Sequence, residues 1–200
     1  MNFINKYLCE TANIISQLDQ SKIKDIIDIL VNTRNKKGRV FFIGVGGSAG
    51  NASHAVNDFR KIGKFECYAP TDNISELTAR TNDEGWEYIF SSWLLTSNLN
   101  KKDLIFIFSV GGGNIKQNIS VNIVNAIKLA KKKKSKIIGI LGKKDGYAAK
   151  FSDTCLIIPE VNKNHTTPHS ESFQTIVWHL IISHPKIKVE QTKWESLKNE

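Results

Sequence analysis

Residues 39–60, RVFFIGVGGSAGNASHAVNDFR, join an apolar run to a glycine-rich turn and then to an amphipathic segment. This order predicts a strand, a tight turn and a helix, because aromatic and β-branched residues favour strands and glycine permits sharp turns. The first turn of such a helix points unpaired N–H groups and the positive end of the helix dipole at the glycine turn. We therefore expect an anion to bind there.

The glycines at 44, 46 and 47 match neither of two common nucleotide-binding motifs. Their spacing is not Gly-x-Gly-x-x-Gly, and no Lys follows Gly47 as it does in the Gly-x4-Gly-Lys-Ser/Thr motif. The turn therefore favours a small phosphorylated ligand over a dinucleotide or a nucleoside triphosphate.

A second segment, residues 104–114 (LIFIFSVGGGN), repeats the same order with a buried strand, Ser109 and three glycines. We expect a helix directly after the glycines, through about Lys131. In an open parallel sheet ligands bind beyond the carboxyl ends of the strands, so both turns can face one crevice. Ser48 and Ser109 would then offer hydroxyls, and the glycine backbone would offer N–H donors. Two turns without a ligand are the alternative, and their pairing on one sheet edge favours the anion site.

The rest of the chain alternates short apolar runs with helical stretches. Apolar positions in residues 3–34 have helical spacing and predict a helical hairpin or a kinked helix, with Ile4, Leu8, Ile14 and Ile15 among its buried residues. Later runs predict five strands, at residues 40–45, 65–69, 104–108, 136–141 and 154–158, and a last helix from about 169 to 183.

Strands that alternate with helices predict an α/β fold, with a five-stranded, doubly wound parallel sheet in three layers and an N-terminal helical extension. We treat residues 1–200 as a single domain. Its N-terminal helices cover residues 1–36, and residues 37–200 form the α/β core, the C-terminal helix and the tail.

Composition limits the class of protein. The chain has 200 residues, of which 40% are hydrophobic and 24% charged, as is usual for a globular protein. No apolar run reaches the roughly 18 residues of a membrane span, and the first ten residues do not resemble a signal peptide. Cys9, Cys67 and Cys155 are odd in number and widely spaced, which favours reduced thiols and a cytoplasmic protein. The net charge of +9 is spread along the chain, so we expect no nucleic-acid partner.

Four segments in order, GVGGSAGNASHAVNDF, ARTNDEGWEYIF, FSVGGGN and ESFQTIVWHLI, resemble the sugar isomerase (SIS) fold. More narrowly, they resemble its sedoheptulose 7-phosphate isomerase (phosphoheptose isomerase) branch, and the resemblance covers nearly the whole chain. It implies a homotetramer that converts sedoheptulose 7-phosphate to D-glycero-D-manno-heptose 7-phosphate, with the site built between subunits. Such an enzyme serves bacterial heptose biosynthesis for lipopolysaccharide or capsule.

The same resemblance assigns roles to individual residues. It implies that the two glycine turns hold the phosphate and that Asn82 and Asp83 line the sugar site. It also implies that four residues occupy the catalytic and zinc-binding positions, namely His54, Asp58, Glu171 and His179. The phosphate-binding residues would be Gly46, Gly47, Ser48, Ser109, Gly111, Gly112, Gly113 and Asn114.

The spacing of the four proposed zinc-binding residues agrees with these roles. His54 and Asp58 are four apart and share one face of a helix, while Glu171 and His179 are eight apart, about 80° around a helix. Imidazole nitrogens and carboxylate oxygens suit Zn²⁺ or a similar divalent ion. From spacing alone, an exposed helix pair and a core histidine remain alternatives. His165 and His169 could supplement the site or lie in a solvated loop.

Isomerisation of a ketose to an aldose moves a proton between C1 and C2 through an enediol. Asp58 can act as the base and His179 as the proton donor, while a metal can polarise the carbonyl and hydroxyl pair. A residue that binds metal tightly is less available to carry a proton. The sequence leaves the division between these two roles open.

The chain also departs from the family pattern. Val45 replaces the usual Asn, and Val110 and Gly111 stand where the second loop usually has two hydroxyl side chains. Asp58 replaces a common Glu, and Glu171 replaces a common Gln. These changes leave open which phosphosugar is bound, and they keep an alternative class, a phosphosugar-binding or replication-initiator-binding protein without turnover. The retained His54, Asp58 and His179 favour an enzyme.

Overall fold

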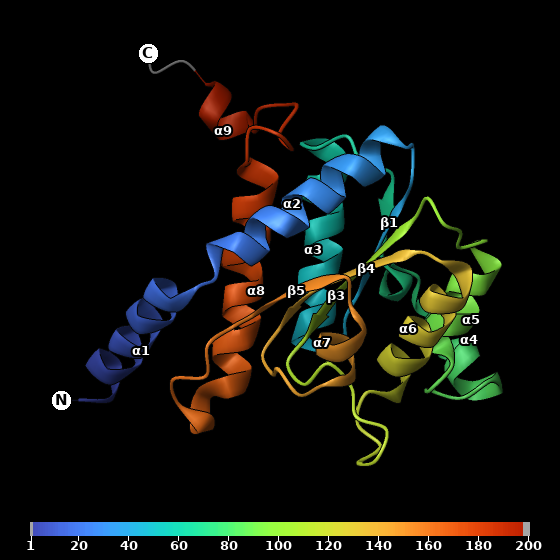
Figure 1. The fold of residues 1–200 in the computed structure, drawn as a ribbon, viewed down its shortest axis with the longest axis horizontal. Coiled ribbons are helices and arrows are strands. Elements are labelled where there is room, and N and C mark those ends of the chain that lie inside the picture. The colour runs from blue at the N-terminus through green and yellow to red at the C-terminus, as the bar shows by residue number, and fades with distance from the viewer. Residues whose placement is uncertain (1, 198–200) are drawn as a thin grey trace.

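The computed structural model describes residues 2–197 of the chain. Its centre is a five-stranded, fully parallel sheet in the order β2-β1-β3-β4-β5 (Figure 1). The doubly wound sheet predicted from the sequence is therefore confirmed, although β1, β2 and β5 are shorter than their apolar runs. The strands are β1 (Val40–Ile43), β2 (Cys67–Tyr68), β3 (Leu104–Ser109), β4 (Lys136–Leu141) and β5 (Thr154–Ile157).

Helices cover both faces of the sheet, because successive strand residues point to opposite sides. Phe42 and Phe106 stack 5.2 Å apart in the core of one face, while Phe41 and Ile105 lie in the core of the other. The first face is covered by α2 (Gln20–Asn35), α3 (Gly47–Lys61) and α8 (Thr166–Ser183). The second is covered by α4 (Ile74–Asp83), α5 (Ile89–Thr96), α6 (Val121–Lys133) and α7 (Tyr147–Phe151).

The N-terminal segment is a kinked pair of helices rather than a hairpin. The first helix, α1 (Phe3–Gln17), and α2 run in the same general direction (Figure 1), and Asp19 accepts hydrogen bonds from the N–H groups of Ser21 and Lys22 to begin α2. Only Glu10 and Ile14 are buried on α1. Three residues expected in the core are exposed by more than half, so that part of the prediction was wrong: Ile4, Leu8 and Ile15.

The two glycine turns follow neighbouring strands. After β1 the chain moves outward to β2, and after β3 it moves to β4 on the other side of the sheet. The carboxyl ends of β1 and β3 therefore border the switch point, where ligands bind in sheets of this order.

The helix predicted directly after the second glycine turn begins later than expected, at Val121. Asn114 and Ile119 form an isolated antiparallel bridge, and the Asn114 side chain accepts a hydrogen bond from the N–H of Gln117. This local turn competes with helix formation, as asparagine often does. The last long helix begins at Thr166, three residues earlier than expected, and Pro168 lies in its first turn, where proline is tolerated.

Three short helical segments complete the description: η1 (Pro70–Asp72), η2 (Lys163–His165) and α9 (Lys193–Ser196). Within residues 2–197, no helix has both the length and the apolar character that a membrane crossing requires. The three cysteines are free thiols. Burial raises the pKa of the Cys67 thiol to about 12, whereas Cys9 is exposed.

Candidate functional site

The first glycine turn leaves the N-terminus of α3 without a side-chain cap. Gly46 precedes the helix with φ at 63°, a conformation that glycine adopts at little cost. At Gly44 a side chain would collide with the backbone of Ser48, so the strand and the helix approach each other closely. Ala49 and Gly50 donate their N–H groups to the carbonyl of Gly46, whereas the N–H groups of Gly47 and Ser48 could bind an anion.

A carboxylate from α8 lies against this helix terminus. A Cβ added to Gly47 would be 2.5 Å from Oε2 of Glu171, so a larger residue at position 47 would displace the carboxylate. The positive end of the α3 dipole stabilises a negative charge in this position. The carboxylate of Glu171 therefore lies at the same end of α3 whose dipole would stabilise a bound phosphate.

The second glycine turn is held by hydrogen bonds to the end of β3 and to the start of α7. Oγ of Ser109 accepts from the N–H of Gly112 at 2.9 Å, which leaves the Ser109 hydroxyl hydrogen free to donate to a ligand. The carbonyls of Gly112 and Gly113 accept from Ala148 and Tyr147 at the start of α7, each at 2.8 Å. The turn is therefore fixed before any ligand arrives.

Three of the four residues in the predicted metal and catalytic set meet between α3 and α8. Oδ2 of Asp58 is 3.7 Å from Nε2 of His179 and 4.0 Å from Nε2 of His54. The three ligand atoms all lie within 4.8 Å of one another, and Asp58 is the most buried of the three side chains. We call these residues the His54 group.

The orientation of His179 is set by its own helix. Nδ1 of His179 lies 2.8 Å from the carbonyl oxygen of Thr175. A carbonyl only accepts, so Nδ1 carries the hydrogen and Nε2 keeps a lone pair directed at the His54 group. A histidine fixed in this way is suited to bind a metal ion, and the donor set of two imidazoles and one carboxylate could hold one.

Asn51 joins the two helices that carry the His54 group, and the sequence analysis missed it. Its Nδ2 donates to the carbonyl of Glu171 at 2.9 Å and to Oε1 of Gln174 at 3.0 Å, while its Oδ1 accepts from Oγ1 of Thr175 at 2.8 Å. Asn51 precedes His54 by three residues and so lies on the same face of α3. The three-residue spacing between Asn51 and His54 was the signal in the sequence that could have identified Asn51.

The remaining predicted site residues lie apart from the His54 group. Glu171 comes eight residues before His179, about 12 Å along the helix axis, and its carboxylate packs on Gly47 instead. Asn82 and Asp83 lie exposed at the end of α4, where Nδ2 of Asn82 donates to Oδ1 of Asp83 at 2.8 Å. No hydrogen bond within the described part of the chain joins either residue to the glycine turns.

A second group of ligating side chains lies at the start of α8. His165 and His169 are not in a solvated loop, because both contact the carboxylate of Glu10 on α1. His169 is 3% exposed. The sequence analysis missed Glu10, because a single acidic residue on an amphipathic helix normally faces solvent.

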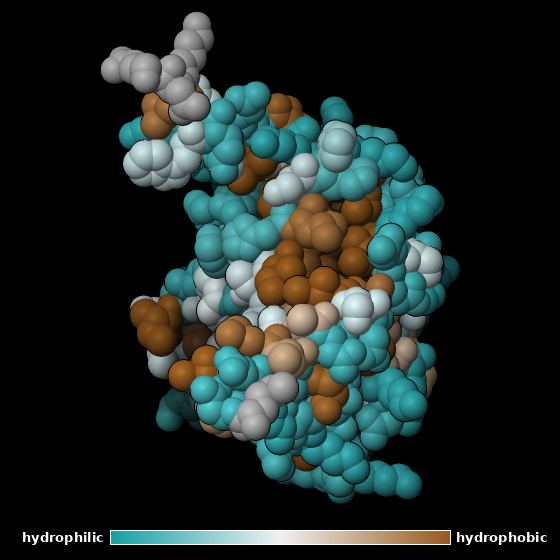
Figure 2. All heavy atoms as spheres, turned by 90° about the vertical axis from the view of Figure 1, so that its left-hand side faces the viewer, coloured by the Kyte–Doolittle hydropathy of each residue, from teal (hydrophilic) through white to brown (hydrophobic). Residues whose placement is uncertain are grey.

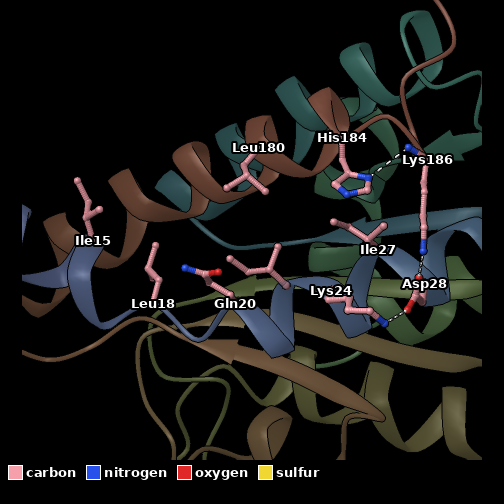
Figure 3. A pocket seen from close by; sticks show the side chains of 10 residues that line it. Ile15, Leu18, Gln20, Lys24, Ile27, Asp28, Leu180, His184 and Lys186 are labelled. Atoms are coloured by element: carbon pink, nitrogen blue, oxygen red, sulfur yellow. Dashed lines mark hydrogen bonds and ion pairs between the residues drawn. The ribbon is translucent and has the colours of Figure 1, made fainter.

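An apolar groove of about 580 Å³ lies between the N-terminal helices and α8 (Figure 3). Ile15, Leu18, Ile27 and Leu180 point into it, and a network of Lys24, Asp28 and Lys186 borders one end. On the side of the molecule where α1 and α8 lie, apolar atoms gather in a hollow surrounded by hydrophilic ones (Figure 2).

Comparison with known proteins places the chain in a family. The SIS domain model matches residues 6–142. A phosphoheptose isomerase of Rhodospirillum rubrum is 30% identical over 149 residues, covering 72% of this chain and 73% of the relative. One of Syntrophotalea carbinolica is 28% identical over 187 residues, covering 88% of this chain and 89% of the relative.

The solved structure of a phosphoheptose isomerase from Neisseria gonorrhoeae has the same fold. It matches with a TM-score of 0.77 at 20% identity and covers 89% of this chain and 94% of its own. The resemblance inferred from the four sequence segments is confirmed. This chain belongs to the SIS domain family, on its phosphoheptose isomerase branch.

Proposed function

We propose that this chain is an aldose–ketose isomerase that converts sedoheptulose 7-phosphate to D-glycero-D-manno-heptose 7-phosphate. The observation that carries the proposal is the meeting of Asp58 with His54 and His179 across α3 and α8. His54 and Asp58 lie on α3, the helix that begins at the first glycine turn. The similarity to phosphoheptose isomerases supplies the substrate class.

The reaction needs a base at carbon and a group that moves protons between the two oxygens. Asp58 is the proposed base, because its carboxylate is held between two helices and faces two imidazoles. In the metal-free protein, the lone pair on Nε2 of His179 can take a proton from a substrate hydroxyl, and the resulting imidazolium can return it to the neighbouring oxygen. Asp58 takes the proton from C1 and, as the carboxylic acid, returns it to C2. Together these steps convert ketose to enediol and enediol to aldose.

The phosphate is proposed to bind between the two glycine turns. The first turn of α3 offers the N–H groups of Gly47 and Ser48, and Ser109 offers a hydroxyl hydrogen. A cavity of about 270 Å³ beside Gly113 and Asn114 is also lined by Lys116 and Lys150. Their charge can compensate for the hydroxyl groups that the second turn lacks.

We propose Zn²⁺ as the cofactor, held by His54, Asp58 and His179. Nε2 of His179 offers a lone pair, and Asp58 offers a carboxylate oxygen within reach of both imidazoles, so the donor set fits the ion. When bound, a divalent ion would polarise the carbonyl and hydroxyl pair of the sugar in place of proton transfer by His179, whose Nε2 would then be a ligand. Glu171 remains a proposed fourth ligand, which would require its carboxylate to leave Gly47.

We propose a cytoplasmic homotetramer. Free thiols at all three cysteines favour a reducing compartment. Phe3, Ile4 and Leu8 on α1 and Ile176 and Leu180 on α8 are exposed apolar residues, and the groove of Figure 3 adjoins them. Such an apolar surface is typical of a face that another subunit covers. Leu180→Glu is expected to reduce the mass measured by light scattering.

The direct test follows the conversion of sedoheptulose 7-phosphate by NMR, with Asp58→Asn and His179→Gln beside the unaltered protein. Asp25→Asn serves as a matched control, because Asp25 is a half-exposed residue of α2. We expect turnover in the unaltered and control proteins and its loss in the two site variants. A folded, zinc-loaded protein without turnover would reject this substrate. Binding of the sugar phosphate without turnover would favour the non-catalytic alternative.

A further inference from the structure

Glu10, His165 and His169 bring three ligating side chains together from α1, η2 and α8. Oε2 of Glu10 is 2.7 Å from Nδ1 of His165 and 3.1 Å from Nε2 of His169. The three side chains are 10%, 20% and 4% exposed. We propose that this Glu10 site binds a second divalent transition metal ion of the zinc class, which fastens α1 to the start of α8.

The spacing of the three ligand atoms fits such an ion. A tetrahedral ion with bonds of about 2.05 Å holds its ligands about 3.3 Å apart. The two separations at Glu10, 2.7 and 3.1 Å, would therefore widen by about 0.6 and 0.2 Å, and all three ligand atoms already lie within 4.8 Å of one another. Two imidazoles and one carboxylate are a common protein ligand set for zinc.

The same nitrogen of His165 faces Glu10 and Asn162. Nδ1 of His165 lies 2.7 Å from Oε2 of Glu10 and 3.1 Å from Nδ2 of Asn162. Without an ion, a hydrogen on Nδ1 donates to the Glu10 carboxylate. With an ion, Nδ1 would give its lone pair to the metal and the hydrogen would lie on Nε2.

Asn162 supports the site from outside the ligand set. Its Nδ2 donates to Oε1 of Glu10 at 2.7 Å, which orients the carboxylate so that Oε2 faces the two imidazoles. A carboxylate oxygen beside two imidazole nitrogens is a suitable set of ligands for a divalent cation.

Aromatic residues on α1 hold the imidazole rings. Tyr7 stacks on His169 with ring centroids 4.4 Å apart, and Phe3 meets His165 edge-on at 5.7 Å. Phe3, Tyr7 and Glu10 recur at helical spacing and so share one face of α1. That face contacts the start of α8 (Figure 1).

A metal at this place would have a structural effect. Only Glu10 and Ile14 are buried on α1, and a helix of 15 residues is marginal by itself in water. An ion bound across α1 and α8 would couple metal binding to the docking of α1. The site is separate from the His54 group, because His169 precedes His179 by ten residues, about 15 Å along the helix.

The test is a titration with Co²⁺, whose visible absorption reports its coordination. It begins with Asp58→Asn/His179→Gln, which removes the His54 group but keeps the Glu10 site. We expect this double variant to bind one Co²⁺ per chain with a low-coordinate spectrum, and addition of Glu10→Gln to weaken the binding by at least about 100-fold. Glu195→Gln, on exposed α9, is the matched control.

Hydrogen exchange provides the second measurement. Zn²⁺ should slow amide exchange in residues 3–17 of Asp58→Asn/His179→Gln, and it should have no such effect once Glu10→Gln or His165→Asn is added. Circular dichroism checks that each variant is folded. The proposal is overturned if the folded double variant binds no Co²⁺, or if its Co²⁺ binding is unchanged by both Glu10→Gln and His165→Asn. These outcomes do not depend on isomerase activity.

Discussion

The carbonyl of Thr175 accepts a hydrogen bond from Nδ1 of His179 at 2.8 Å, and this bond leaves Nε2 of His179 3.7 Å from Oδ2 of Asp58. The carboxylate is thus directed at a histidine whose tautomer is already set. Asp58→Asn removes the base but preserves the shape of the side chain. We expect kcat to fall by about 10²- to 10⁴-fold, measured by NMR with saturating substrate.

Asp58→Glu tests the distances within the His54 group, because it keeps the carboxylate and lengthens the side chain. The gaps of 3.7 and 4.0 Å around Oδ2 of Asp58 exceed the ligand spacing of a tetrahedral zinc ion, about 3.3 Å. A side chain longer by one methylene can move the carboxylate toward both imidazoles. We expect Asp58→Glu to keep activity and to bind Zn²⁺ at least as tightly as the unaltered protein. Loss of both would contradict the proposed geometry.

Asn51 is expected to control how α3 and α8 align. Asn51→Ala removes three hydrogen bonds and leaves Oε1 of buried Gln174 without its partner. We expect the free energy of unfolding to fall by about 1–3 kcal/mol and kcat to fall more than the affinity for substrate. Asn125→Ala, which breaks one exposed bond to Glu87, is the control and should change neither.

The cysteines should differ sharply in reactivity. Cys9 is exposed, whereas burial raises the pKa of Cys67 to about 12 and leaves almost no thiolate at neutral pH. We expect a thiol reagent to modify Cys9 rapidly and Cys67 only after unfolding. Mass spectrometry of the labelled peptides distinguishes the two. Rapid labelling of Cys67 in the folded protein would contradict its place in the sheet.

Asp153 should contribute to stability at neutral pH and lose that contribution in acid. Burial raises its pKa, but hydrogen bonds from Nζ of Lys136 and the N–H of Ile137 outweigh burial, so the pKa lies below its ordinary value of 3.8. The folded state therefore favours the ionised carboxylate. The stabilisation is present above pH 3.8 and falls as the pH drops through the lower folded value.

The measurement compares denaturant unfolding of the unaltered protein and Asp153→Asn as a function of pH. The difference in stability should be constant near neutrality and should shrink below about pH 4. Asp145→Asn controls for a change of net charge. A difference that grows in acid would show that the sign of the shift is wrong.

The order of layers was predictable because it depends on local patterns. Runs such as residues 104–108 are apolar on both faces and so predict buried parallel strands, and the glycine turns mark where β1 and β3 end. The late start of α6 was not predictable. It depends on the side chain of Asn114 accepting the N–H of Gln117, and helix propensity does not report that competition.

The candidate site was predictable only in part, for a similar reason. Spacing placed His54 beside Asp58, and the resemblance added His179, but neither revealed that Glu171 packs on Gly47. That contact depends on how α8 packs against α3, which is tertiary structure that local sequence patterns do not report. Glu10 was missed because its two histidines come from the other end of the chain.

Glu171→Gln separates two roles for this carboxylate. In the structure Glu171 lies at the N-terminus of α3, where its charge would oppose a phosphate. If that is its place in solution, the amide should raise the affinity for inorganic phosphate by about 3- to 10-fold at low salt, an effect that added salt reduces. The binding of Co²⁺ by the His54 group should then be unchanged.

If Glu171 is instead the fourth metal ligand, Co²⁺ binding should weaken by at least about tenfold with little gain in phosphate affinity. Calorimetric titration with each ion decides between the two, and Glu195→Gln controls for the loss of one negative charge far from α3.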